Sequence, residues 1–205
     1  MSATGRSSVR VDGDFYRTPA WVVRALLESE PLHGPILEPS CGTGEMMEAL
    51  SVPALLPIVG VELDEDRHAC ARMLEDRAGR RCRVYRGDFL DPHRDLRERL
   101  DRWSFAAVIG NPPYKHAAGF VRKSLEIVPP GGRVCMLLRL NFLGSSRKRL
   151  DVVGPGSGLA RVIVLAKRPS FTGKGTDACE YAWLIWVRGF TGEARLSVYA
   201  GPVLP

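Results

Sequence analysis

Short apolar runs of strand length alternate with helix-like segments along most of the chain, and this alternation restricts the fold more than any other feature. We expect strands at Pro35–Glu38, Pro57–Glu62, Arg83–Arg86, Phe105–Ile109, Arg133–Leu138, Arg161–Ala166 and Tyr181–Val187. We expect helices at Pro19–Glu28, Gly44–Leu50, Asp64–Ala78, Asp91–Arg102, Ala117–Val128 and Ser146–Val152. Such an order predicts an α/β fold, a mainly parallel sheet with helices on both faces. Only Lys167–Glu180 separates the last two strands, so these two should pair antiparallel.

Length and composition favour one soluble domain. The 205 residues suit a single core, and 45% hydrophobic with 25% charged residues is ordinary for globular proteins. The apolar runs are too short for a transmembrane helix, and the first residues lack the apolar stretch of a signal peptide. We therefore expect a flexible tail over residues 1–14, one domain over residues 15–205, a cytoplasmic location and no membrane partner. In the first helix, Thr18 is the expected N-cap and Pro19 lies in the first turn.

The cysteine count and the distribution of charge narrow the possible kinds of site and partner. The five cysteines are odd in number and form no Cys-x-x-Cys pair, which argues against a disulfide framework or a metal site. We expect each to be a reduced thiol packed as a small hydrophobe. The net charge is +6, and the segment from Arg139 to Lys174 holds eight basic residues and one acid. Such a concentration favours a phosphate-bearing partner over a merely solvated face.

A glycine turn follows the first expected strand, in the stretch Glu38-Pro39-Ser40-Cys41-Gly42-Thr43-Gly44. Glycines permit a tight turn near a ligand, and the helix that starts at Gly44 presents backbone amide donors there. The second strand ends at Glu62, which can accept hydrogen bonds from ribose hydroxyls. After the third strand, Asp88 can accept from an adenine amino group, and Phe89 offers an apolar wall.

Each of these acids alone could be an ordinary surface carboxylate, but together with the turn they describe a nucleoside pocket. The position three beyond Gly44 is Met47, so the third glycine of the dinucleotide fingerprint is missing. This favours a nucleoside cofactor without phosphates, such as S-adenosylmethionine.

The fourth strand leads into Asn111-Pro112-Pro113-Tyr114. Two prolines fix the backbone, so the Asn111 side-chain oxygen and the Pro112 carbonyl can act as two convergent acceptors. Acceptors on the hydrogens of a conjugated amine favour a pyramidal nitrogen and make its lone pair available. The Tyr114 ring can stack on a base. A proline turn that merely ends a strand is the alternative interpretation.

On these motifs the chain resembles the amino-group S-adenosylmethionine-dependent DNA methyltransferases, chiefly the adenine-N6 enzymes of restriction systems and phages. Phe15-Tyr16-Arg17-Thr18-Pro19 is similar to the family's amino-terminal cofactor motif, and its place before the catalytic motif matches the gamma group. The resemblance implies a seven-stranded Rossmann-like sheet with a reversed last strand and direct methyl transfer, without Cys41 as a nucleophile. The cofactor residues it implies are Tyr16, Thr18, Glu38, Pro39, Ser40, Gly42, Gly44, Glu62, Leu63, Asp88, Phe89 and Asn111. The catalytic residues it implies are Asn111, Pro112, Pro113 and Tyr114.

The resemblance departs at the carboxyl end, where only 18 residues, 188–205, follow the last expected strand. No separate target-recognition domain is therefore expected, which leaves relaxed recognition, surface loops, a homodimer or another subunit. The basic stretch Lys167–Thr176 should lie on the same rim as Asn111 and meet DNA. Its expected substrate-binding residues, together with Tyr114, are Lys167, Arg168, Phe171 and Lys174. An ordinary mobile hairpin is the alternative.

Two other functions stay open. The same tetrapeptide serves methyltransferases of a guanine amine in ribosomal RNA or of a protein glutamine amide, although those families usually carry a domain before the glycine turn. A non-catalytic cofactor-binding subunit of a restriction-modification complex is the remaining alternative.

Overall fold

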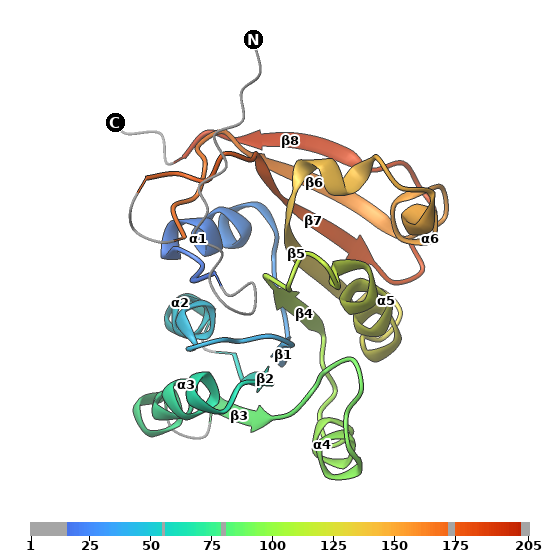
Figure 1. The fold of residues 1–205 in the computed structure, drawn as a ribbon. Coiled ribbons are helices and arrows are strands. Elements are labelled where there is room, and N and C mark those ends of the chain that lie inside the picture. Colours follow the sequence, from blue (N-terminus) through green and yellow to red (C-terminus); the bar gives the residue numbers. More distant parts are fainter. Residues whose placement is uncertain (1–15, 55, 79–80, 172–174, 202–205) are drawn as a thin grey trace.

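The protein forms an α/β sandwich in which one sheet is covered by helices on both faces (Figure 1). The computed structural model describes residues 16–54, 56–78, 81–171 and 175–201, so the predicted tail over residues 1–14 lies outside the described residues. Helices α1, α2 and α3 cover one face of the sheet, and α4, α5 and α6 cover the other. Each face has its own apolar cluster, which the alternating side chains of the central strands fill. None of the helices in these ranges is long and apolar enough to cross a membrane.

The elements follow the predicted alternation. The strands are β1 (Ile36–Glu38), β2 (Ile58–Glu62), β3 (Cys82–Arg86), β4 (Ala107–Gly110), β5 (Arg133–Arg139), β6 (Leu159–Leu165), β7 (Tyr181–Val187) and β8 (Arg195–Tyr199). The α-helices are α1 (Ala20–Ser29), α2 (Glu45–Ala54), α3 (Glu65–Ala78), α4 (Arg94–Leu100), α5 (Ala117–Ile127) and α6 (Leu150–Val153). Two 3₁₀ turns, η3 (Leu140–Leu143) and η4 (Arg147–Arg149), follow β5.

The strand order β3-β2-β1-β4-β5-β7-β6-β8 contains a topological switch between β1 and β4. From β1 the chain builds outward through β2 and β3, then returns to place β4 on the other side of β1. The loops that leave neighbouring strands therefore separate at the carboxyl ends of β1 and β4. Open α/β sheets bind their ligands at such a point.

Strand β7 is antiparallel to both β5 and β6, and its pairing with β6 agrees with the prediction from the helix-free connection Lys167–Glu180. Two tryptophans on this strand tie the sheet to helices on opposite faces. The indole N–H of Trp183 donates to the Val22 carbonyl of α1 at 2.8 Å, and that of Trp186 donates to the Val152 carbonyl of α6 at 2.6 Å. Both side chains are fully buried, so each polar N–H has the partner that burial demands.

Three sequence predictions need correction. The sheet has eight strands rather than seven, because β8 pairs parallel with β6 at the sheet edge; its Leu196 and Val198 are 68% and 60% exposed, so it lacks the buried run of a core strand. The N-cap of α1 is Pro19, not Thr18, whose hydroxyl is used elsewhere. Finally, Cys70 is exposed rather than packed in the core.

Candidate functional site

A cavity of about 230 Å³ lies at the switch point, and most of the predicted cofactor residues line it. The predicted residues in its wall are Tyr16, Thr18, Glu38, Pro39, Ser40, Glu62, Leu63, Asp88, Phe89, Asn111 and Pro113. They come from the segment before α1 and from the ends of β1, β2, β3 and β4. The topology thus brings together residues that are up to 97 positions apart in the sequence.

The two glycines of the turn serve the fold rather than the cavity wall. Gly42 and Gly44 have φ angles of 57° and 95°, which favour glycine. A Cβ on Gly44 would lie 2.5 Å from the Leu74 side chain, so this glycine lets α2 approach α3 closely. Gly42 turns its backbone N–H toward Glu62 instead of a ligand.

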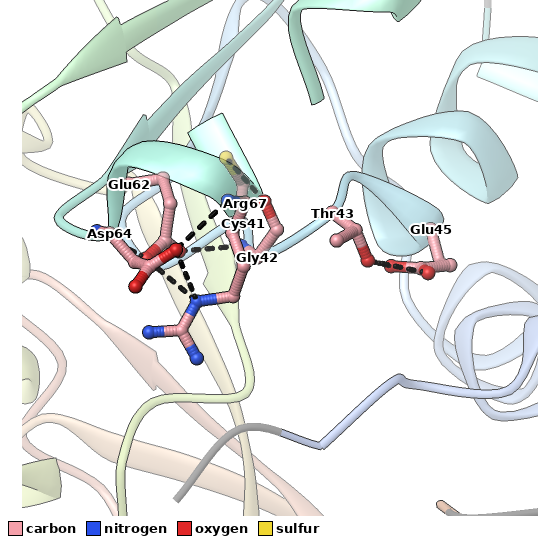
Figure 2. A network of polar contacts seen from close by, with 7 residues as sticks. All are labelled: Cys41, Gly42, Thr43, Glu45, Glu62, Asp64 and Arg67. Atoms are coloured by element: carbon pink, nitrogen blue, oxygen red, sulfur yellow. Dashed lines mark hydrogen bonds and ion pairs between the residues drawn. The ribbon is translucent and has the colours of Figure 1, made fainter. Parts of the chain in front are cut away.

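Glu62 is held from three directions (Figure 2). Its carboxylate accepts the N–H of Gly42 at 2.8 Å and that of Asp64 at 2.9 Å, and it lies 3.4 Å from Nε of Arg67. These contacts connect the turn after β1 to the end of β2 and fix the carboxylate at the cavity wall. A carboxylate has about four lone-pair sites, so this arrangement leaves capacity for further donors.

Glu38 is the most unusual acid of the site. It is 2% exposed, and burial raises its pKa well above the ordinary value, with the negative charges of Glu45 and Glu62 adding to the effect. The backbone N–H of Met47, in the first turn of α2, opposes this shift. Its Oε2 atom is buried and has no hydrogen-bond partner within the described ranges. A buried acid of this kind has a strong preference for a cationic or hydrogen-bond-donating ligand.

Cys41 lies in the same turn, and its thiol is buried. Burial raises the pKa of its thiol well above the usual range, and the carboxylates of Glu38 and Glu62 raise it further. The neutral thiol is the unreactive form of cysteine.

At the end of β3, Asp88 uses one oxygen to accept the Leu90 N–H at 2.8 Å, which closes a turn. Phe89 is 2% exposed and stacks on Phe120 of α5, with ring centroids 5.4 Å apart. Both residues line the cavity, which places a carboxylate and an aromatic ring next to each other in its wall.

Asn111 shows a definite orientation. Its Nδ2 lies 3.2 Å from the Thr18 hydroxyl and 3.5 Å from the Tyr16 backbone carbonyl. A carbonyl only accepts, so the atom that faces it must be the amide nitrogen. The opposite atom, Oδ1, is buried and has no partner within the described part of the chain. Pro112 is buried beside it. The amide is therefore anchored through its nitrogen, and its oxygen remains an available acceptor.

Tyr114 lies among aromatic and cationic groups. The guanidinium of Arg139 is 4.6 Å from its ring centroid, and the ring of Tyr16 stacks on it at 5.8 Å. Burial, together with the nearby Tyr181, raises the pKa of the Tyr114 phenol far above its ordinary value, so this group stays neutral. Arg139 donates to the Tyr181 hydroxyl at 3.2 Å, and that hydroxyl donates to Asp177 at 2.7 Å.

Sequence reasoning missed the set Arg139, Tyr181 and Asp177. It counted Arg139 as one of the phosphate-facing cations, but the structure directs this side chain to Tyr114 and Tyr181. Arg161 likewise pairs with the buried Glu30. The available signal was an arginine directly after the five buried apolar residues of β5, a position where a charged side chain needs a partner.

The segment between β6 and β7 is more deeply packed than its polarity predicts. Phe171 is 8% exposed and contacts the rings of Tyr16 and Tyr181, with centroids 5.5 and 5.0 Å away. Arg168 pairs with Glu180, and Lys167 lies 5.9 Å from the Trp21 ring centroid. Lys174 lies outside the described residues. Phe171, predicted to bind substrate on the rim of the site, is thus packed in the apolar core.

No family model and no curated protein sequence matches the chain. Among solved structures, a class I S-adenosylmethionine-dependent methyltransferase from Listeria monocytogenes is similar, with a TM-score of 0.72 and 15% identity over 96% of this chain and 69% of that one. The fold is that of the S-adenosylmethionine-dependent methyltransferases.

Two structures from restriction-modification systems share this fold. A chain from a type I restriction-modification assembly has a TM-score of 0.65 and 19% identity, and covers 95% of this chain. The M protein of the type I restriction enzyme EcoKI has a TM-score of 0.61 and 18% identity, and covers 86%. This chain spans only 47% and 44% of their lengths.

Proposed function

We propose that the protein binds S-adenosylmethionine in the switch-point cavity. When bound, this cofactor supplies an electrophilic methyl group on a positively charged sulfur. The buried oxygen of Glu38, which has no hydrogen-bond partner among the described residues, suits a ligand with a cationic methionine part. Glu62 has spare acceptor capacity for ribose hydroxyls, and Asp88 with Phe89 would hold the adenine ring.

We propose that the substrate amine is the exocyclic amino group of adenine in DNA. The observation that carries this proposal is the Asn111 amide, anchored through Nδ2 so that Oδ1 is free to accept. Asn111 Oδ1 and the Pro112 carbonyl would accept the two amine hydrogens and leave the nitrogen lone pair exposed for bond formation. One N–H proton then passes to solvent after transfer, since the Cys41 thiol and the Tyr114 phenol are poor proton acceptors.

Tyr114 would hold the target base by stacking, after the base has left its helix. Its ring is already in contact with Arg139 and Tyr16, and Tyr16 also contacts Phe171. An entering base competes with Tyr16 for the space between Tyr114 and Phe171. Base entry therefore requires a shift of the Tyr16 ring.

DNA is thus the proposed partner of a single catalytic domain. One of the similar structures comes from the complex assembly of a type I restriction-modification system. We propose on this basis that a separate recognition subunit or a second copy of the chain extends the contact with DNA.

The decisive experiment uses methyl-labelled S-adenosylmethionine with unmethylated genomic DNA, ribosomal RNA and a release factor in parallel. We expect label in N6-methyladenine after digestion of the DNA, and none with the Asn111→Ala variant. Label in an RNA guanine or a protein glutamine would replace the proposed substrate. Cofactor binding without any labelled product would instead indicate a non-catalytic subunit.

A further inference from the structure

A second cavity, of about 440 Å³, lies along β3 between α3 and α4 and shares no residue with the switch-point cavity. We call it the α3–α4 groove. Its basic lining residues are His68, Arg72, Arg83, Arg86, His93 and Arg99, and its acids are Glu75 and Asp95. Strand β3, along which the groove lies, forms the edge of the sheet opposite the β8 edge (Figure 1). Nothing in the proposed methyl transfer uses these cations.

The acids of the groove already have structural roles. Glu75 accepts the Val84 backbone N–H at 2.6 Å, a group on the open edge of β3. This contact also blocks the addition of another strand at that point, which disfavours an extended peptide as the occupant. Asp95 lies in the first turn of α4, where a negative charge stabilises the helix.

The cations are arranged to receive an anion. Arg99 lies over the Tyr85 ring at 5.5 Å, so its planar group is oriented beside the groove. His93 accepts the Leu96 N–H through Nδ1 at 3.2 Å, which places the ring proton on Nε2 as a donor. Arg86 pairs with Glu65 at 3.0 Å, but both side chains are more than half exposed, so a phosphate can compete for this arginine.

We propose that the α3–α4 groove binds the phosphodiester backbone of the nucleic acid whose target base enters at Asn111. Arginine matches phosphate oxygens with paired N–H donors, which suits this ligand. Strand β3 is separated from β4 by β2 and β1, so the groove lies roughly 14 Å from Asn111 across the sheet. That span corresponds to about four nucleotides of one DNA strand. The proposal rests on the proposed nucleic-acid substrate but concerns a separate surface.

The test compares two triple variants of the full chain. The groove variant carries Arg72→Gln, Arg86→Gln and Arg99→Gln. The matched control carries Arg77→Gln, Arg94→Gln and Arg102→Gln, which lie on or next to the same helices, are exposed and do not line the groove. Binding to fluorescein-labelled 16-nucleotide single-stranded DNA, its duplex and the equivalent RNA is measured by anisotropy over a range of salt concentrations.

We expect the groove variant to lower the log–log salt slope by up to about 0.9 for each phosphate that is no longer neutralised, which near 0.1 M salt is roughly an eightfold weaker affinity per phosphate. The control should stay within about twofold of the wild type. Equal losses in the groove variant and the control would overturn the proposal, as would unchanged binding by the groove variant. A wild type that binds neither DNA nor RNA would do the same.

Methyl transfer is scored separately from binding, so the two proposals can fail independently. If the wild type methylates DNA while the groove variant binds like the control, only the groove is rejected. If nucleic acid binds through the groove but RNA rather than DNA becomes methylated, the groove stands and the DNA substrate is rejected.

Discussion

The cofactor side of the site and the target side are held together in different ways. On the cofactor side, the carboxylates at the ends of β1, β2 and β3 each accept nearby backbone N–H groups: Glu38 from Met47, Glu62 from Asp64, and Asp88 from Leu90. On the target side, side chains hold other side chains over long sequence separations. Thr18 and Asn111 are 93 residues apart, and Arg139 and Tyr181 are 42 apart.

The difference shows that the binding wall is fixed largely by backbone N–H donors near the strand ends, whereas the reacting geometry depends on contacts between distant side chains. Substitutions on the cofactor side should therefore change ligand affinity. Substitutions on the target side should change turnover while cofactor affinity is retained.

The largest effect is expected at Asn111. Asn111→Ala should lower methyl transfer about 10²- to 10³-fold, the range that follows loss of one preorganised transition-state hydrogen bond, while the cofactor still binds. Tyr114→Ala should also severely reduce turnover, because the stacking platform is removed. The chain's other asparagine, Asn141, is exposed, so Asn141→Ala is the matched control. If either Asn111→Ala or Tyr114→Ala kept wild-type turnover, the assignment of the Asn-Pro-Pro-Tyr tetrapeptide to methyl transfer would be wrong.

Glu62→Ala tests the cofactor side. Loss of hydrogen bonds to a charged group should weaken S-adenosylmethionine binding by about 1.5–3 kcal/mol, as measured by calorimetry. Glu65→Ala is the control, since that side chain is 72% exposed. Unchanged affinity in the Glu62 variant would assign the ribose to another acid, with Asp64 the next candidate.

Arg139→Met tests whether the Arg139 guanidinium positions the Tyr114 ring on which it lies. A partly desolvated cation–π contact contributes about 0.5–2 kcal/mol, so kcat should fall about 2- to 30-fold with cofactor affinity unchanged. Arg149→Met removes a similar contact, over Phe142 at 4.8 Å, away from the site and should leave kcat unchanged. A loss confined to KM, or equal losses in both variants, would argue against a positioning role.

The smallest effect concerns the segment between β6 and β7. Replacement of Lys167, Arg168 and Lys174 by Ala should reduce the log–log salt slope of DNA binding by up to about 0.9 for each phosphate that the segment no longer neutralises. Because Arg168 pairs with Glu180 and Lys167 lies over Trp21, we expect less than the full sum. Cofactor affinity should not change. An unaltered slope would show that this segment does not meet DNA.

The sequence predicts the parallel part of the fold and the placing of the acids in the cavity wall, because each acid lies at the end of a strand or two residues after it. The ends of β1, β2 and β3 bring Glu38, Glu62 and Asp88 to one edge by topology alone. The roles of these residues toward a ligand stay predictions.

Features that depend on long-range partners could not be predicted. Thr18 has the residue type and place of a helix cap, and only packing shows that its hydroxyl serves Asn111. The charge of the basic segment is offset by acids outside it, such as Glu30 and Glu180, so a local count overstates the free positive charge. Strand β8 has no buried apolar run and is held by pairing with β6.

The buried carboxyl of Glu38 has a consequence for the lifetime of the protein. Because its pKa is raised in the folded state, the folded protein holds a proton that the unfolded chain releases above pH 4.5. Stability therefore falls as the pH rises from 4.5, and the loss is complete once the pH exceeds the raised pKa. A cationic ligand that binds beside Glu38 only in the folded form would offset this loss of stability. Proteolysis acts on the unfolded fraction, so we expect the cellular abundance of the protein to follow the supply of that ligand.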